Sequence, residues 1–218
     1  MGIDPCGTCV TTSKQEAFKT CDVLIDFTTA EAMIEHAQLA HEHGRALVVG
    51  TTGLGEPEMA ALKFASQKAP ILQAANMSVG VNLLLSMVEK AASMLGTEYD
   101  IEIFEAHHRH KIDAPSGTAL ALAQSVAKGR NVNLDDALVP ARYGQIGARP
   151  VGAIGISVFR GGDVVGDHTV TFAGDGERIE FSHKASDRSL FAKGAVRAAM
   201  WLGGQKPGLY SMRDVLGI

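Results

Sequence analysis

Cysteine is scarce in this sequence, with three residues among 218. Cys6, Cys9 and Cys21 are too few for the disulfide framework that holds small secreted domains together. Cys6 and Cys9 form a Cys-x-x-Cys pair, a spacing that also occurs in redox and zinc sites. The sequence has no second pair to complete a four-cysteine zinc site, and this pair precedes every predicted strand. We therefore interpret it as incidental.

The sequence also lacks an excess of positive charge and any long apolar run. Its formal net charge is −4, whereas proteins that bind nucleic acids generally are usually basic. No apolar run approaches the length of a membrane-spanning helix, and no secretory signal pattern opens the chain. A hydrophobic content of 46% and a charged content of 20% are typical of globular proteins. We expect a cytoplasmic protein of one large or two small domains, with no nucleic-acid or membrane partner.

The first part of the chain alternates short apolar runs with helix-like segments. Strands are predicted at 22–27, 46–49 and 70–75, and helices at 30–43 and from Pro57 to about residue 67. Thr28 and Thr29 can cap the first of these helices, and Gly44 can end it. Because strands separated by helices of this length are typical of βαβ units, residues 1–77 predict a parallel sheet.

The carboxyl ends of the three predicted strands share a simple chemistry. Each end carries small or polar residues, which let a ligand approach the backbone closely. These ends are Phe27-Thr28, Gly50-Thr51-Thr52 and Ala74-Ala75-Asn76. In open parallel sheets, ligands bind outside the carboxyl ends of the strands. One such end is compatible with an ordinary turn, but three together indicate a groove of the size that a nucleotide needs.

From residue 78 onward the pattern changes. The expected elements are a helix at 79–95 that is apolar on most sides, a long loop at 128–152, β-rich runs at 155–159, 164–172 and 177–183, and a helix at 189–202. The apolar helix is predicted to be buried. Gly161-Gly162 and Asp175-Gly176 are hairpin signals. We therefore expect an α/β fold, with a parallel-sheet domain at 1–77 and an α+β domain at 78–188.

The segment from Glu105 to Thr118, EAHHRHKIDAPSGT, holds a dense group of proton-carrying and cationic side chains. It follows a strand-like run at 99–104 and leads into a helix-like run at 119–128. Imidazoles exchange protons near neutral pH, and a lysine of lowered pKa can act as an acid. The Ser-Gly-Thr sequence opens the helix, where backbone N–H groups attract anions. The segment suits a small anionic substrate that is protonated during its reaction.

Two other interpretations of this segment stay open at this point. A basic turn is often only a solvated loop. Histidine is also a common metal ligand, but His107, His108 and His110 are too close in sequence to converge easily on one ion. A metal-dependent hydrolase is therefore the weaker alternative, and we expect no metal.

The same segment resembles the signature of the dihydrodipicolinate reductase family. Other segments match that family in order along nearly the whole chain: 22–28, 49–53, 74–82, 161–168 and 183–186. The resemblance implies an NAD(P)H-dependent oxidoreductase that reduces 4-hydroxy-tetrahydrodipicolinate, a small cyclic dicarboxylate, in diaminopimelate and lysine biosynthesis. It also implies a Rossmann-like cofactor domain, to which residues 189–218 return, and a mixed-sheet domain that binds substrate and forms a homotetramer.

The resemblance also implies roles for individual residues. His107 is similar to the family's acid/base histidine, and Lys111 to its proton donor. The positions that hold the substrate carboxylates are His108, Gly117 and Thr118. The positions that line the NADH or NADPH cofactor are Gly50, Thr51, Thr52, Ala74, Ala75, Asn76 and Met77. Arg188 falls where the family's chain crosses back between domains, and it is a candidate interdomain contact.

The sequence departs from the family at its beginning. The family starts with a strand and a Gly-x-Gly-x-x-Gly turn for the cofactor pyrophosphate, and residues 1–9 contain neither. Without that strand, exposed sheet edges are expected. We expect a fragment or a start-site error of an ordinary reductase. The alternatives are a truncation that reduces poorly and a non-catalytic dicarboxylate-binding or oligomerisation module. The residue that would select NAD or NADP is also absent.

Overall fold

The computed structural model describes residue 7 and residues 10–218, so the Cys6–Cys9 pair lies outside the described residues. The chain forms two compact units. The first unit comprises the chain up to Ala75 together with Ala195–Val215. The second unit comprises Asn76–Gly194 and Leu216–Ile218.

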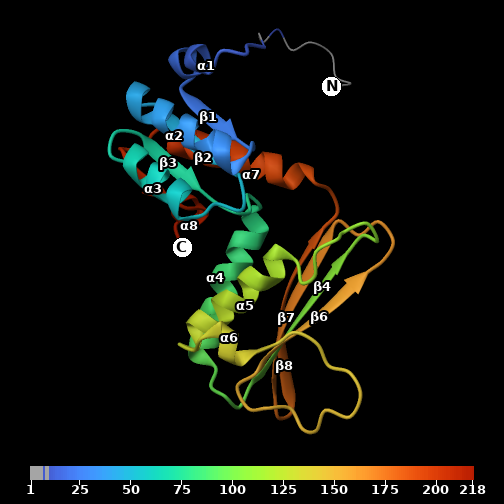
Figure 1. Cartoon of the computed structure of the whole chain (residues 1–218). Coiled ribbons are helices and arrows are strands. Elements are labelled where there is room, and N and C mark those ends of the chain that lie inside the picture. Colours follow the sequence, from blue (N-terminus) through green and yellow to red (C-terminus); the bar gives the residue numbers. More distant parts are fainter. Residues whose placement is uncertain (1–6, 8–9) are drawn as a thin grey trace. The chain divides into compact units, whose positions relative to one another are not determined.

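The helices and strands follow the chain from blue to red in Figure 1. The helices are α1 (Lys14–Thr20), α2 (Ala30–His43), α3 (Glu56–Ala65), α4 (Val79–Met94), α5 (Gly117–Gly129), α6 (Leu134–Ala137), α7 (Ser189–Leu202) and α8 (Met212–Leu216). The strands are β1 (Val23–Asp26), β2 (Ala46–Val49), β3 (Pro70–Gln73), β4 (Asp100–His107), β5 (Leu138–Val139), β6 (Ile154–Arg160), β7 (Gly166–Gly174), β8 (Glu177–Ala185) and β9 (Gly208–Tyr210). Most predicted elements are confirmed to within a few residues, whereas α1, α6, β5, β9 and α8 were not predicted.

The first unit is built around a parallel sheet with the strand order β1-β2-β3-β9. Leu47 of β2 lies opposite Ile71 of β3. Because side chains alternate between the faces of a sheet, Leu47, Val49 and Ile71 share one face, where they join Met33 and Leu62 in a buried core. Figure 1 shows α2 and α3 on one side of this sheet and α7 on the other. The predicted parallel sheet is confirmed.

Local sequence features set both ends of α2. The hydroxyl of Thr29 accepts the N–H of Ala32 at 3.3 Å, which is a typical N-cap. Gly44 follows the last turn with φ of 61°, a conformation that glycine adopts without strain from a side chain. The helix therefore begins and ends where the sequence predicts.

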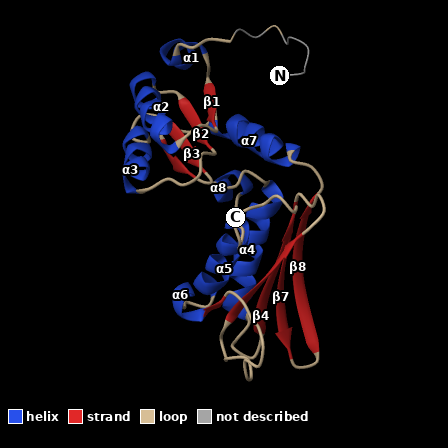
Figure 2. Ribbon diagram, turned by 45° about the vertical axis from the view of Figure 1, so that its right-hand side comes forward, coloured by secondary structure: helices blue, strands red, loops and turns tan. Residues whose placement is uncertain are grey.

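The second unit is built around a mixed sheet with the strand order β5-β6-β4-β7-β8. Its central strand, β4, pairs in parallel with β6 and antiparallel with β7. Figure 2 shows α4 and α5 over one face of this sheet. Ile101, Ile103 and Phe172 of the strands meet Val88 and Leu122 of the helices in the core. Among the described residues, no helix covers the opposite face. The predicted mixed sheet is confirmed.

The connections in the second unit confirm one hairpin signal and correct another. Asp175-Gly176 joins β7 to β8 as an antiparallel hairpin, as predicted. Gly161-Gly162 does not form a hairpin, because β6 pairs with β4 and β4 lies between β6 and β7. The predicted loop at 128–152 is also wrong in part, because it contains α6 and β5. The Asn133 side chain caps α6 by accepting the N–H of Asp135 at 3.1 Å.

The prediction that α4 is buried on most sides is wrong for one of its faces. Leu84 and Val88, four residues apart, point into the core. Leu83 and Met87 lie on another face, and each is 47% exposed. The sheet and α5 can cover only part of a helix surface, so the remaining apolar side chains of α4 face outward.

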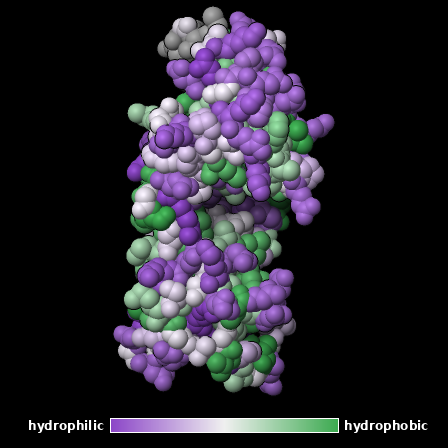
Figure 3. All heavy atoms as spheres, turned by 90° about the vertical axis from the view of Figure 1, so that its left-hand side faces the viewer, coloured by the Kyte–Doolittle hydropathy of each residue, from purple (hydrophilic) through white to green (hydrophobic). Residues whose placement is uncertain are grey.

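One face of the surface is seen in Figure 3. On it, hydrophilic side chains predominate over the first unit, and apolar side chains lie among them in small groups. Within residues 7 and 10–218, no helix is both long enough and apolar enough to span a membrane.

Candidate active site

The last residues of β4 carry the first part of the candidate site. The sequence predicts a strand that ends at Phe104, but β4 continues to His107. Since alternate residues of a strand share a face, Glu105 and His107 lie on the face that Ile101 and Ile103 turn toward the helices. His107 is therefore held by the sheet and not by a turn.

Glu105 is fully buried, with 0% exposure, and both of its carboxylate oxygens are engaged. Arg160 donates two bonds of 2.8 Å, from Nη1 to Oε2 and from Nη2 to Oε1. The N–H of Ser116 donates to Oε1 at 2.9 Å, and Nδ1 of His107 lies 2.6 Å from Oε2. Arg160 also donates to the carbonyl oxygen of Asp113 at 2.7 Å. These contacts join β4, β6 and the loop before α5.

The pKa of Glu105 is set by two opposing effects. Burial raises it, because a surrounding of low dielectric constant disfavours the charged form. Hydrogen bonds from Arg160, His107 and Ser116 favour the charged form, and together they hold the pKa below its ordinary value. Glu105 is therefore ionised at neutral pH.

His168 of β7 packs against His107 and is almost completely buried. The two rings meet edge to face, with centroids 5.2 Å apart and an interplanar angle of 74°. Nε2 of His168 lies 3.1 Å from Oγ of Ser116, while its Nδ1 has no hydrogen-bond partner among the described residues. Burial, with a contribution from His107, lowers the pKa of His168 to about 4. His168 is therefore neutral at neutral pH.

The N-terminus of α5 presents backbone N–H groups beside these side chains. The Ser116 hydroxyl accepts the N–H of Ala119 at 3.2 Å, and the Ser116 carbonyl accepts that of Leu120 at 3.0 Å. Since the first N–H groups of a helix lack intrahelical partners, those of Gly117 and Thr118 can bind an anion. A side chain at Gly117 would meet no heavy atom within 4 Å, so the space beside it is open.

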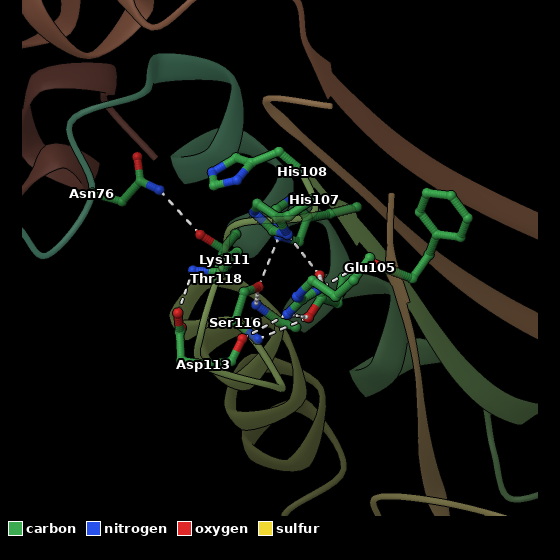
Figure 4. A network of polar contacts seen from close by, with 12 residues as sticks. Asn76, Glu105, His107, His108, Lys111, Asp113, Ser116 and Thr118 are labelled. Atoms are coloured by element: carbon green, nitrogen blue, oxygen red, sulfur yellow. Dashed lines mark hydrogen bonds and ion pairs between the residues drawn. The ribbon is translucent and has the colours of Figure 1, made fainter. Parts of the chain in front are cut away.

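Lys111 lies in the loop between β4 and α5. Its ammonium nitrogen is 2.8 Å from Oδ1 of Asp113. The hydrogen bond from Lys111 lowers the pKa of Asp113, so this carboxylate is ionised at neutral pH. Figure 4 shows the two side chains directed at one another. The loop thus places a cationic donor near the start of α5.

His108 follows β4 and lies close to a second cation. Nη2 of Arg188 lies 3.3 Å from Nε2 of His108. Partial desolvation lowers the pKa of His108, and the nearby charges of Arg188 and other cations lower it further. The neutral imidazole is therefore favoured, and the positive charge here comes mainly from arginine and lysine. An open hollow of about 720 Å³ lies here, lined by His108, Arg109, His110, Gly162, Asp163 and Arg188.

Asn76 connects two sets of predicted residues. Its amide nitrogen donates to the hydroxyl of Thr118 at 3.2 Å, a contact drawn in Figure 4. Its side-chain oxygen accepts the N–H of Ser78 at 2.9 Å, and its carbonyl accepts the side chain of Asn82 at 2.7 Å. These bonds fix the orientation of the amide. A residue expected to line the cofactor therefore touches one expected to bind substrate, within the second unit.

The other predicted cofactor residues occupy the carboxyl ends of β2 and β3. The N–H of Gly50 donates to the carbonyl of Asp26 at 2.8 Å, and that of Ala74 to the carbonyl of Val49 at 3.1 Å. Thr51 is buried, whereas Thr52 and Ala75 are exposed. Five of the predicted cofactor residues belong to the first unit: Gly50, Thr51, Thr52, Ala74 and Ala75. Asn76 and Met77 belong to the second unit.

A buried carboxylate organises the strand ends of the first unit. Asp26, 4% exposed, accepts the N–H and the hydroxyl of Thr28 at 2.8 and 2.7 Å. It also accepts the Thr51 hydroxyl at 3.2 Å, and Nδ1 of His36 lies 2.7 Å from its Oδ2. Burial raises the pKa of Asp26, but the bonds from Thr28 and His36 outweigh burial and lower it.

The three histidines of the 105–118 segment do not converge on one point. Nδ1 of His107 faces Glu105, and Nε2 of His108 faces Arg188. Among residues 7 and 10–218, no group of three or more His, Cys, Asp or Glu side chains is arranged to hold a metal ion.

Two family models match the chain over almost its whole length. Residues 1–77 match the model described as "Dihydrodipicolinate reductase, N-terminus", and residues 80–216 match "Dihydrodipicolinate reductase, C-terminus". The chain belongs to the dihydrodipicolinate reductase family. The resemblance noted from the 105–118 segment is thereby confirmed.

Similar proteins carry the corresponding name. The 4-hydroxy-tetrahydrodipicolinate reductase of Magnetococcus marinus is 51% identical over 216 residues, which cover 99% of this chain and 81% of that protein. The protein of the same name from Pseudomonas fluorescens is 55% identical over 197 residues, covering 90% and 74%. A solved structure, the dipicolinate-bound dihydrodipicolinate reductase from Paenisporosarcina sp. TG-14, matches with a TM-score of 0.76 at 24% identity, covering 92% and 76%. That match supports the fold.

Sequence reasoning missed several residues that organise this member of the family. Arg160, His168 and Ser116 contact the predicted site from other strands or from the turn, and none was assigned a role. Glu105 was part of the signature but was not singled out. A Glu-x-His pattern at a strand end was the available signal, since it places both side chains on one face. The arginine partner on β6 could not be found in this way.

Proposed function

We propose that this chain reduces 4-hydroxy-tetrahydrodipicolinate to tetrahydrodipicolinate with NADH or NADPH, a step of diaminopimelate and lysine biosynthesis. The observation that carries this proposal is the arrangement within the second unit. There, Asn76 donates to Thr118 at the open N-terminus of α5, and His107, His108 and Lys111 belong to the strand end and loop that lead into this helix. This arrangement can bind a small dicarboxylate and deliver a proton to it.

The start of α5 would hold one substrate carboxylate. The N–H groups of Gly117 and Thr118 point out of the first turn, where the helix dipole favours negative charge by about 0.3–2 kcal/mol. The Ser116 cap already uses the N–H of Ala119, so only the first two N–H groups are left for the ligand. His108 would contact the substrate as a neutral hydrogen-bonding group.

Lys111 is the proposed proton donor. Its ammonium group stays close to the α5 N-terminus through the 2.8 Å contact with Asp113. Proton transfer by a positioned acid typically contributes about 10²–10⁴ to the rate. His107 is the proposed acid/base partner, and its imidazole is fixed by the buried carboxylate of Glu105.

The strand ends of the first unit are the proposed binding edge for a nicotinamide dinucleotide. A side chain at Gly50 would collide with the ring of Phe27, so glycine lets this ring pack against the buried backbone of residue 50. The residues proposed to line the cofactor are Gly50, Thr51, Thr52, Ala74, Ala75, Asn76 and Met77. When bound, the cofactor supplies the hydride that reduces the substrate.

A homotetramer and a cytoplasmic location are further parts of this proposal. The face of the second sheet that carries no helix exposes two aromatic side chains, Phe104 at 45% and Phe159 at 46%. Phe159 of β6 lies opposite Ala106 of β4, and Phe104 is two residues before Ala106. Since alternate residues of a strand share a face, both rings lie on this face of the sheet. Exposed apolar side chains of this kind support subunit contact. Sedimentation analysis of the purified chain would measure its mass in solution.

The experiment that tests the proposal is a reductase assay with a matched pair of lysine variants. The purified chain is expected to consume NADH or NADPH only when 4-hydroxy-tetrahydrodipicolinate is present, with the same rate in the presence of a chelator. Lys111→Ala is expected to lower kcat by about 10²-fold or more while KM changes much less, because it removes the acid. Lys128→Ala is the control, since Lys128 pairs with Glu89 at the far end of α5.

The outcomes separate the alternatives. Loss of activity with a chelator would support the metal-dependent hydrolase, and binding of a dicarboxylate without NAD(P)H consumption would support a non-catalytic module. An unchanged kcat in Lys111→Ala would contradict the role of Lys111 as proton donor.

A further inference from the structure

We infer that Glu105 is a positioning residue that selects the Nδ1–H tautomer of His107 and, through its second oxygen, holds the start of α5 in place. This inference rests on the proposed function, because it assigns His107 an acid/base role. It concerns a fully buried side chain that acts through its two neighbours.

The geometry gives each carboxylate oxygen of Glu105 a separate partner. Oε2 lies 2.6 Å from Nδ1 of His107, and Oε1 accepts the N–H of Ser116 at 2.9 Å. Ser116 is the N-cap of α5, so its position sets the position of the Gly117 and Thr118 N–H groups. One rigid group therefore fixes both the proposed proton carrier and the proposed carboxylate site.

The charge of Glu105 decides the tautomer. Arg160 binds both oxygens at 2.8 Å, and the side chain is fully buried, so the carboxylate stays ionised. An ionised carboxylate can only accept hydrogen bonds. The proton shared across the 2.6 Å contact must therefore come from Nδ1 of His107. Nε2 is left as the nitrogen that exchanges a proton during the reaction.

The surroundings of Nε2 agree with this assignment. A side chain at Gly166 would come within 3.0 Å of Nε2 of His107, so glycine on β7 avoids a close contact with this nitrogen, in a residue that is 9% exposed. The ring of His168 packs edge to face against His107 and bonds to Ser116, which keeps the imidazole from tilting away from Glu105. A neutral His168 adds no competing charge beside the proton carrier.

A purely structural role for Glu105 is the alternative, because the same carboxylate also neutralises Arg160. The two roles differ in what they predict for His107. A structural role affects folding and stability but does not depend on which ring nitrogen carries the proton. A positioning role requires the Nδ1–H tautomer and affects kcat more than KM.

The test combines kinetics of Glu105→Gln with nitrogen NMR of histidine-labelled protein. The glutamine amide has the same shape and can donate to Nδ1, which would move the imidazole proton to Nε2. We expect the variant to keep the KM for substrate and cofactor within about threefold and to lose about 10²-fold or more in kcat. The His107 signals should change from the Nδ1–H to the Nε2–H pattern.

Glu102→Gln is the matched control. Glu102 lies on the same strand and also accepts two 2.8 Å bonds from one arginine, Arg142, but it faces the other side of the sheet. This variant should leave kcat and the His107 tautomer unchanged. An equal loss of kcat in both variants would overturn the inference.

The NMR measurement on the unsubstituted protein keeps the inference testable if Glu105→Gln fails to fold. An Nε2–H tautomer of His107 in that protein would overturn the inference whatever the activity. An active reductase whose Glu105→Gln variant folds and keeps its kcat would also overturn it, while leaving the proposed function intact. Absence of reductase activity in the unsubstituted chain would instead contradict the proposed function.

Discussion

Two buried carboxylates, one in each unit, occupy similar places at strand ends and are stabilised differently. Asp26 ends β1, and Glu105 lies two residues before the end of β4. Each lies close to Nδ1 of a histidine, at 2.7 Å from His36 and at 2.6 Å from His107. Asp26 also accepts the backbone N–H of Thr28, and Glu105 accepts that of Ser116.

The difference lies in the remaining partners. Glu105 has a permanent cation, because the guanidinium of Arg160 binds both of its oxygens. Asp26 instead accepts hydroxyl groups, from Thr28 at 2.7 Å and from Thr51 at 3.2 Å. An arginine stays charged at any pH at which the protein folds, so the ionisation of Glu105 does not depend on its histidine.

This comparison shows two ways to keep a buried carboxylate charged. In both, burial raises the pKa and the hydrogen-bonding partners lower it further than burial raises it. A carboxylate whose pKa is lowered by folding stabilises the folded state above its unfolded pKa, and this contribution is lost as the pH falls through the folded value.

The largest expected effect comes from removing the permanent cation. Arg160→Met leaves Glu105 buried beside an apolar side chain, and breaking a buried ion pair in this way destabilises proteins by about 3–5 kcal/mol. Urea unfolding at neutral pH would measure the loss. Arg142→Met is the control, since Arg142 binds Glu102 at the same 2.8 Å in a more exposed pair. Exposed pairs contribute about 0–1 kcal/mol, so a similar loss of stability in both variants would mean that burial does not make the Arg160 pair more important than the Arg142 pair.

A smaller effect is expected from the neutral histidine beside the Glu105 cluster. His168 has a pKa of about 4 in the folded protein, against an ordinary value of 6.5. The unfolded state therefore binds more protons between these pH values, so stability should fall as the pH drops from 6.5 to 4. Across this pH range, the free energy of unfolding should fall by on the order of 3 kcal/mol because of His168.

Unfolding measured across this pH range would test the expectation for His168. His168→Gln keeps a polar group near Ser116 but does not titrate, so the variant should show a flatter dependence of stability on pH. The same slope in both proteins would mean that another group causes it.

The smallest effect is expected at the carboxylate without a permanent cation. Asp26→Asn replaces the charged acceptor of Thr28, Thr51 and His36 by a neutral one, and hydrogen bonds to charged groups contribute about 1.5–3 kcal/mol. The loss, measured by unfolding at pH 7, should shrink at strongly acidic pH, where Asp26 is itself protonated. Asp22→Asn is the control, because the side chain of Asp22 is fully exposed. An equal loss of stability in Asp22→Asn would mean that the buried hydrogen bonds of Asp26 stabilise the protein no more than an exposed carboxylate does.

Much of the fold could be predicted from local patterns. The limits of α2 follow from Thr29 and Gly44, and the Asp175-Gly176 turn follows from its sequence. The Gly161-Gly162 prediction was wrong because a glycine pair marks a turn without saying which strands pair across it. The insertion of β4 between β6 and β7 depends on contacts between residues more than 50 positions apart, such as Ile101 and Ile154.

The candidate site shows the same division. The sequence by itself determined the residue types, because a segment rich in imidazole, ammonium and helix-start N–H groups predicts acid/base and anion-binding chemistry through local spacing. Only the tertiary structure decided which atoms meet: Arg160 and His168 reach Glu105 and Ser116 from neighbouring strands. The reason is that propensity and capping act over a few residues, whereas burial and charge pairing depend on segments that the chain brings together only when it folds.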